Sequence, residues 1–462
     1  MLASNAKDDT GGDRFAMDSA LTAEQALALA PDGASAKAAT GLASDRHWVA
    51  LGGDAEALWG ECKGSGAKPY QAQVDLAALV TRCSCPSRKF PCKHALALLL
   101  MHARGGIAAA PRPAWVEEWL NSRRDRAEKK EQAAVKAAAA QAADPDAAAA
   151  GAAKREAARW KRIDQGTAEL QRWIGDQLRR GLASFGPQQR AEWTAMAARM
   201  VDAQAPALST QVLAAADAMA SGVAGAPAVL ERFGLIWLLR EAVARRETLS
   251  PQRLADVRTA LGWVYDKDDL ATLGESVSDR WIVQGQRIDE RDDRLFERRV
   301  WLRGQASGRD ALLHDYAYGG RGWEQQWLDG RSVEANLRFF PGSVPLRALA
   351  LEQGAAQPAP RWSQPAVEAI ERASLAFAAN PWLPWWPLSL ADAVPVRERE
   401  RWWLHTAAGR LPLVLGETAG WNLLAHSGGR ALQVMGEWDG RSLRPLSAWC
   451  GEDAAQNWSL AA

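Results

Sequence analysis

The sequence lacks an excess of charge of either sign, and it has no long apolar run. Its 56 lysines and arginines are balanced by 55 aspartates and glutamates, which gives a formal net charge of +1. This balance excludes a protein that covers polyanions with its whole surface, as a histone does, but it allows a local basic patch. The apolar run Ala95–Met101 is far too short to cross a bilayer, and Met1–Phe15 has no apolar segment of the secretory type. We therefore expect a soluble, cytoplasmic protein that does not associate with a membrane.

Cysteine and two of the three aromatic residues are also scarce. Five cysteines among 462 residues cannot form the disulfide framework of a small secreted domain. There are only 4 tyrosines and 8 phenylalanines, whereas tryptophan occurs 23 times, and 14 of these tryptophans lie at or after Trp281. Large aromatic side chains serve both in cores and in recognition surfaces. The core is the favoured interpretation, and a tryptophan-rich recognition surface is the alternative.

Catalytic motifs are missing as well. The sequence contains no G-x-x-x-x-G-K-[ST] phosphate loop, no G-x-G-x-x-G, no H-E-x-x-H and no G-x-S-x-G. We therefore predict that the chain is not an enzyme. The alternative is an unrecognised active site in the C-terminal region, acting on carbohydrate or peptide, where hydrolysis of a glycoside would need a pair of carboxylates. Asp392, Glu417 and Glu437 are candidates, but no recognisable motif surrounds them.

Composition and hydrophobic period divide the chain into five segments and predict a multidomain α+β fold. The first folded segment combines short strands with an apolar helix that stops at Gly105-Gly106. An Ala/Lys/Glu-rich stretch broken at Pro145 follows, and it has too few large apolar residues to form a core. Apolar residues then recur at three- and four-residue spacing, which predicts five to seven helices. The expected segments are 1–19 (disordered), 20–105 (strand–helix domain), 106–159 (helical or partly disordered linker), 160–275 (helical domain) and 276–462 (β-rich, tryptophan-rich domain).

After Ser278 the hydrophobic period changes to two, as in half-buried strands. Asp329-Gly330 and Asp439-Gly440 are hairpin signals in similar phrases, which two unrelated hairpins explain more simply than an internal duplication. Residues 380–387 (NPWLPWWP) interrupt the strands and are a candidate link between two sub-sheets. The predicted strands are Trp281–Ile288, Arg298–Arg303, Ala311–Tyr318, Val333–Phe340, Arg401–His405, Gly420–Ala425 and Ala431–Trp438.

Four soft metal ligands lie within twelve residues of one another. Cys83 and Cys85 are two apart, so they project to the same side of an extended chain. Residues two apart do not share a face of a helix, so Cys92 is expected in the turn before the apolar helix and His94 in its first turn. Three thiolates and one imidazole fill a tetrahedral Zn²⁺ site with no open position, as in structural sites. The alternative, three unligated thiols beside a surface histidine, needs a coincidence of four such residues.

The C-x-C-x(6)-C-x-H pattern, with a strand before it and an apolar helix after it, resembles the SWIM zinc finger. The resemblance covers about residues 47–103, and the four residues above fill all the ligand positions. Less specifically, Val201–Pro206 (VDAQAP) and Phe340–Arg347 (FPGSVPLR) are similar to segments of long bacterial SWIM-finger proteins. The resemblance implies one structural zinc, DNA or protein binding and no enzymatic activity. It also implies a MoxR-type AAA+ ATPase or a von Willebrand A-domain protein as a candidate partner, because such proteins are often encoded nearby.

One charge asymmetry accompanies the ligands. Leu76–Val116 contains six basic residues and no acidic one, and the ligand loop joins two of these cations to a phenylalanine, which suits phosphate contact and base stacking. The alternative is that the cations offset the negative charge of a three-thiolate site. The candidate nucleic-acid-binding or partner-binding residues are Arg82, Arg88, Lys89, Phe90 and Lys93.

Together these patterns predict a zinc-stabilised binding or adaptor protein. The finger is expected to contact DNA, RNA or a protein partner. Because tryptophan is enriched at interface hot spots, the C-terminal region is expected to be a platform for protein interactions.

Overall fold

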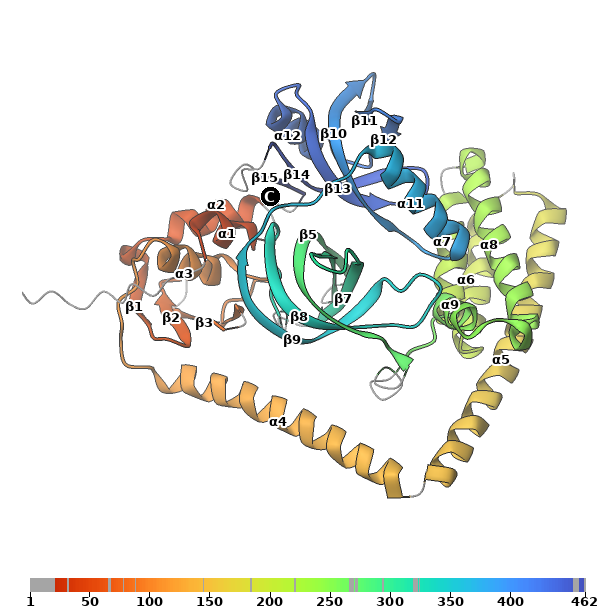
Figure 1. Cartoon of the computed structure of the whole chain (residues 1–462), viewed down its shortest axis with the longest axis horizontal. Helices are drawn as coiled ribbons and strands as arrows, with labels where there is room; N and C mark the ends of the chain where they lie inside the picture. The colour runs from red at the N-terminus through yellow and green to blue at the C-terminus, as the bar shows by residue number, and fades with distance from the viewer. Residues whose placement is uncertain are drawn as a thin grey trace, which may run out of the picture.

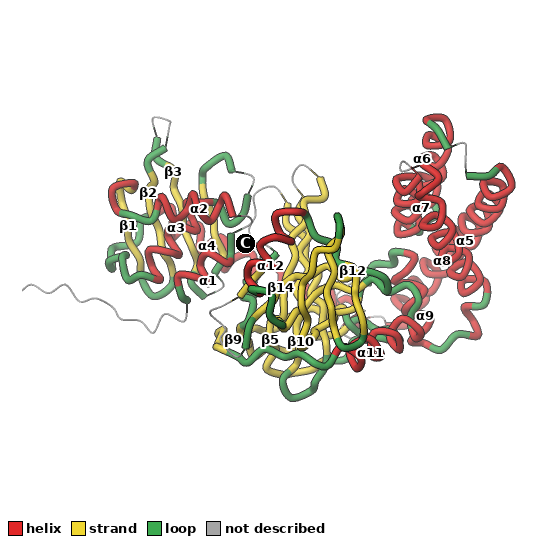
Figure 2. The backbone as a smooth tube through the Cα atoms, turned by 90° about the horizontal axis from the view of Figure 1, so that it is seen from above, coloured by secondary structure: helices red, strands yellow, loops and turns green. Residues whose placement is uncertain are grey.

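The computed structural model describes residues 21–460, apart from 31–32, 65–67, 78, 88, 144, 183–184, 220–221, 266–269, 271–272, 293–294, 319–322, 324 and 452–456. The expected disorder of residues 1–19 concerns residues outside this part. A strand–helix unit, a helical bundle, a closed β-barrel and a second sheet follow one another along the chain (Figure 1). Seen from above, the strands of the last two form the middle of the molecule, between the first unit and the bundle (Figure 2). The predicted α+β class is confirmed.

The N-terminal unit is a four-stranded antiparallel sheet with a buried helix on one face. The sheet has the order β1-β2-β3-β4. Helix α3 is buried along nearly its whole length, because it packs against β2, β3 and β4 on one side and against α1 and α2 on the other. The elements are α1 (Ala23–Ala28), α2 (Gly33–Leu42), β1 (Trp48–Gly53), β2 (Ala57–Cys62), β3 (Tyr70–Asp75), β4 (Val80–Cys83) and α3 (Lys93–Ala103).

The other face of this sheet is covered by the start of the next helix. Val116 and Trp119 of α4 (Ala114–Ala143) pack with Trp59 and Val80 in a small buried cluster. The packing of the N-terminal unit therefore extends beyond residue 105, where the sequence placed its end. Helix α4 then runs away from the sheet, and the chain turns at the predicted break into α5 (Pro145–Arg180), which enters the bundle (Figure 1).

The helical bundle has one apolar core, built from α5 onward. Trp193 lies at its centre, where it contacts Trp173, Phe185 and Phe233 and donates a hydrogen bond from Nε1 to Gln177. Ser250 caps α9 by accepting from the backbone N–H of Arg253. The helices after α5 are α6 (Pro187–Asp202), α7 (Pro206–Met219), α8 (Ala226–Ala244) and α9 (Pro251–Leu261).

A closed five-stranded barrel follows, in the order β5-β6-β7-β9-β8. All neighbouring pairs are antiparallel except β7–β9, which is parallel, and the long β5 pairs with β8 through its first half and with β6 through its second. The hairpin predicted at Asp329-Gly330 is wrong, because β7 and β8 are not neighbours in the barrel. The strands are β5 (Ser276–Asp292), β6 (Leu295–Gly304), β7 (Asp310–Tyr318), β8 (Arg331–Phe339) and β9 (Arg347–Pro358).

The second sheet has the order β12-β11-β10-β13-β14-β15 and packs against α11 and the barrel. The strand predicted at Gly420–Ala425 is wrong: these residues lie in helix α12, whose buried positions recur every three or four residues and which ends at Gly428. The hairpin predicted at Asp439-Gly440 is confirmed, between β13 and β14. The elements are α11 (Ala366–Ala379), β10 (Trp386–Glu398), β11 (Arg401–Thr406), β12 (Gly409–Pro412), α12 (Glu417–Ser427), β13 (Leu432–Trp438), β14 (Leu443–Trp449) and β15 (Asn457–Ser459).

The Pro/Trp-rich stretch connects α11 to β10 and joins three bodies. Trp382 donates from Nε1 to the carbonyl of Leu235 in the bundle, and the ring of Trp385 lies under the guanidinium of Arg299 in the barrel. Nine of the 14 tryptophans at or after Trp281 are buried, so the core interpretation holds for most of them. None of the described helices combines the length and apolarity that a membrane crossing needs.

Candidate metal centre

The four predicted ligands meet where strand β4 passes into helix α3. Cys83 is the last residue of β4 and lies opposite Ala72 of β3. The next residue, Ser84, is fixed to Gln71 by two hydrogen bonds, one from each backbone N–H. Cys92 is the N-cap of α3, and its carbonyl accepts from the N–H of Leu96. The predicted placement of Cys92 before the helix and of His94 in its first turn is confirmed.

The ligand atoms form a tight cluster that fits a tetrahedral metal ion. The three sulfurs and one ring nitrogen lie within 4.8 Å of one another. His94 Nδ1 is 3.7 Å from Cys83 Sγ and 3.9 Å from Cys92 Sγ. Zinc–sulfur and zinc–nitrogen bonds in a tetrahedron give ligand–ligand separations of roughly 3.5–3.8 Å. The donor set and its spacing therefore fit one structural Zn²⁺, held by Cys83, Cys85, Cys92 and His94.

The sulfurs are close enough to change one another's acidity. Hydrogen bonds with Cys85 and Cys92 raise the pKa of Cys83 far above the ordinary value of a cysteine. Hydrogen bonds with Cys83 and Cys92 hold the pKa of Cys85 well below that ordinary value. A hydrogen bond with Cys83 lowers the pKa of Cys92, but the bond with Cys85 and burial outweigh it and raise this pKa to about 11. Because zinc binds thiolates, loading this site releases the protons that the cysteines hold.

A groove of about 630 Å³ opens beside the ligands, between the ligand loop and helix α2. Small residues of α2 form one wall, among them Ala34 and Ala38. The ring of Tyr70 also lines the groove and lies 5.2 Å from the ring of His94. The charged side chains that line it in the described part of the chain are all lysines: Lys63 from the end of β2, Lys89 from the ligand loop and Lys93 from α3.

The structure brings together only some of the residues that the sequence singled out for binding. Lys89 and Lys93 line the groove, whereas Phe90 is half-buried and is not among the lining residues. Arg82 is exposed on β4, and strand alternation places it on the opposite face of the sheet from Cys83. Arg88 lies outside the described residues.

The sequence did not indicate two residues that line the groove, and it suggested a binding role for one basic residue that is ion-paired within the unit. Lys63 and Tyr70 flank the β2–β3 turn, and they could have been found by placing that turn next to the ligands. Arg112 was counted in the basic segment, but its guanidinium forms ion pairs with Asp54, Glu56 and Glu117. That arginine therefore secures α4 to the sheet.

Two of the three candidate carboxylates of the C-terminal region make structural contacts. Glu437 is buried and accepts from the Arg299 guanidinium and from Trp301 Nε1. Glu417 is ion-paired with Arg397 on the surface, and Asp392 is exposed at a bulge of β10.

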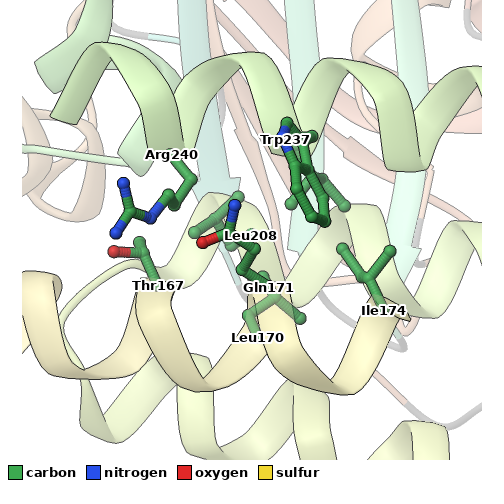
Figure 3. Close-up of a pocket in the computed structure, with 8 residues that line it drawn as sticks. Thr167, Leu170, Gln171, Ile174, Leu208, Trp237 and Arg240 are labelled. Carbon is green, nitrogen blue, oxygen red and sulfur yellow. The ribbon is translucent and has the colours of Figure 1, made fainter. Parts of the chain in front are cut away.

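A second hollow lies between α5, α7 and α8 of the bundle, where Leu170 and Ile174 face Trp237 (Figure 3). Among the described residues that line it, Arg240 alone is charged. It therefore offers no pair of groups for acid–base chemistry.

The closed site of three cysteines and one histidine defines the N-terminal unit as a structural zinc finger. Residues 70–103 match the family model of the SWIM zinc finger, and residues 158–261 match that of the SWIM-associated four-helix bundle domain. No curated protein and no solved structure matches the chain. The chain is thus a SWIM-type zinc finger protein, and its finger and metal cluster indicate zinc-dependent binding.

Proposed function

We propose that this protein is a non-catalytic binding protein and that its finger binds nucleic acid through the lysine-lined groove. The observation that carries the proposal is the groove itself. It lies against the zinc ligands, and three lysines from separate segments line it without a described carboxylate among them. A site of this sign and shape suits a phosphate backbone.

The charge of the zinc site does not account for all three lysines. A Zn²⁺ ion with three thiolates carries a formal charge of about −1, which one lysine offsets. Lys63 is also held by a hydrogen bond from its Nζ to the carbonyl of Arg46, 3.1 Å away. The three lysines therefore carry more positive charge than the zinc site needs, and Tyr70 adds an aromatic surface on which a base can stack.

The test measures, by fluorescence anisotropy over a range of salt concentrations, how tightly the full chain binds labelled duplex and single-stranded DNA and RNA. The double substitution K89A/K93A is expected to weaken binding for all sequences alike and to reduce the salt slope by up to about two. The variant K154A/K161A, which removes two exposed lysines from α5, is the matched control for charge and should bind as the unmodified protein does.

Native mass spectrometry must show one zinc in every variant, so that a lost metal is not mistaken for a lost contact. Unchanged binding by K89A/K93A, or no binding of any nucleic acid at low salt, would overturn the proposal. That result would favour a protein ligand for the finger, for which the expected MoxR-type ATPase or A-domain protein is the first candidate.

A further inference from the structure

A row of aromatic side chains lies on the outer face of barrel strand β7. Ala311 and Leu313 point into the barrel core, so alternation places His314, Tyr316 and Tyr318 outside. Tyr316 is 56% exposed and Tyr318 is 63% exposed. The His314 ring lies 5.0 Å from the Tyr316 ring. These three residues form what we call the β7 ladder.

Arginines surround the ladder. Arg347, on the neighbouring strand β9, is exposed, and in the described part of the chain no carboxylate lies within ion-pair distance of it. Burial and the charge of Glu297 raise the pKa of the Tyr316 hydroxyl, and the charges of Arg347, Arg291 and Arg299 act in the opposite direction. The carboxylate of Glu297 beneath them is buried and already paired with His314 and Arg291. The open face is therefore aromatic, and the exposed guanidinium of Arg347 adds a positive charge beside it.

The topology of the barrel points to the same face. Its strand order, its parallel pair β7–β9 and its long first strand are those of the OB-type barrel, in which the face of the second and third strands binds oligonucleotides or oligosaccharides. Here those strands are β6 and β7. A fold alone does not define a ligand, and the ladder and its arginines supply the chemistry at this position.

Part of this face is already occupied by the second sheet. Trp301 and Leu312 point outward but pack into the core shared with that sheet. The ladder lies beyond this covered part. Tyr316 and Tyr318 are two residues apart along a strand, roughly 6.6 Å, which is about twice the 3.4 Å step of a stacked duplex.

We infer that the β7 ladder is a binding site for single-stranded nucleic acid, separate from the groove of the finger. Successive bases of an extended strand stack on Tyr316 and Tyr318, and Arg347 and Arg291 lie beside the phosphates. A duplex keeps its bases inside and cannot use such a ladder. An oligosaccharide would also stack on aromatic rings, but the surrounding arginines favour an anionic ligand.

The experiment uses the full, zinc-loaded chain with a fluorescein-labelled 12-nucleotide oligo(dT) and oligo(U). Anisotropy gives the affinity, and ultraviolet crosslinking followed by peptide mapping gives the site. Introduced into K89A/K93A, which lacks the finger cations, Y316A/Y318A is expected to lower the affinity about 10-fold or more, because each stacked base is worth roughly 1–3 kcal/mol. Y316F/Y318F keeps both rings and should bind within about 3-fold of the unmodified protein. W421A removes an exposed tryptophan from α12 and should have no effect.

The outcomes separate this site from the finger. Crosslinks within residues 310–318 that are lost in Y316A/Y318A but kept in K89A/K93A support the inference, even if the finger groove binds no nucleic acid. Crosslinks confined to the finger, equal affinity of K89A/K93A with and without Y316A/Y318A, or no binding of either oligonucleotide would overturn it. Binding of a neutral hexasaccharide without binding of the oligonucleotides would also overturn it. Circular dichroism and the zinc content must match in all variants, so that a misfolded chain does not count as lost binding.

Discussion

The guanidinium of Arg299, on barrel strand β6, donates two hydrogen bonds to the carboxylate of Glu437, on strand β13 of the second sheet. The two side chains are 1% and 0% exposed, and Trp301 Nε1 donates to the same carboxylate. An ion pair this deep is strong only while every member keeps its partner, because either charge alone would be left buried. The pair therefore makes the barrel and the second sheet depend on one another.

Replacing Glu437 with alanine should lower the free energy of unfolding of the β region by about 3–5 kcal/mol, because a buried arginine loses its main acceptor. Denaturation followed by near-ultraviolet circular dichroism measures this change, since Trp301 and Trp385 lie at the pair. Asp176→Ala, which breaks an exposed pair with Arg179, is the control and should cost at most about 1 kcal/mol. Equal effects of the two substitutions would contradict the interpretation.

Loss of one zinc ligand should unfold the finger locally. Cys92→Ser is expected to remove the zinc from the native mass spectrum and to expose the finger to proteases, because a structural Zn²⁺ contributes on the order of 10–16 kcal/mol of binding free energy. The control is Cys450→Ser, which changes a partly buried cysteine of the second sheet and should keep the metal. Full zinc content in Cys92→Ser would exclude this ligand set.

The helical bundle should stay folded in Cys92→Ser, because it has its own core. The barrel segment that contacts the finger should become more accessible to proteases. Leu328, just before barrel strand β8, is buried within the core of the finger. The finger therefore contacts the barrel directly, in addition to its connection to the bundle through α4 and α5. A stable finger should therefore protect this loop. Proteolysis at residues 325–330 that appears together with loss of zinc would show the coupling.

A second connection centres on Asp256 of α9. Its carboxylate accepts from the backbone N–H of Ser343, in the β8–β9 loop, and from Nδ2 of Asn380, after α11. Asp256→Ala would leave both donors without their acceptor, and we expect a loss of about 2–3 kcal/mol in stability. Asp256→Asn keeps one acceptor oxygen and should lose less. Equal losses in the two variants, measured by chemical denaturation, would argue against a hydrogen-bonding role.

The zinc ligands were predictable because their geometry is local. The spacing of Cys83, Cys85, Cys92 and His94 already requires a strand end, a loop and a helix start. The groove was not predictable in the same way, since Lys63 and the α2 wall reach it through tertiary packing. The basic segment was misleading at Arg112, whose partners Asp54 and Glu56 lie far away in sequence.

The C-terminal region shows the limits of period-two patterns. Strand β8 alternates between buried and more exposed positions from Val333 to Phe339, and it was found. Gly420–Ala425 was mistaken for a strand because six residues are too few to separate the two periods, and burial at Gly420 and Leu423 is helical in spacing. Barrel closure could not be predicted, because it depends on the parallel pair of β7 with β9, a strand rich in alanine and glutamine that no pattern indicated.

The last prediction concerns pH. Burial raises the pKa of Asp329 to about 6, although the charge of Arg361 acts in the opposite direction, and Oδ1 of this carboxyl group has no hydrogen-bond partner among the described residues. A carboxyl group whose pKa is higher in the folded than in the unfolded chain binds its proton more tightly when folded. Its contribution to stability is therefore complete below its ordinary pKa of 3.8 and is lost as the pH rises through about 6. Asp329→Asn cannot ionise, so it should leave stability unchanged near pH 4 and raise it by about 1–3 kcal/mol at pH 8 relative to the unmodified protein. Chemical denaturation at both pH values, with the exposed Asp217→Asn as control, measures the difference. A gain that does not change with pH would show that the carboxyl group is ionised in the folded chain throughout this range.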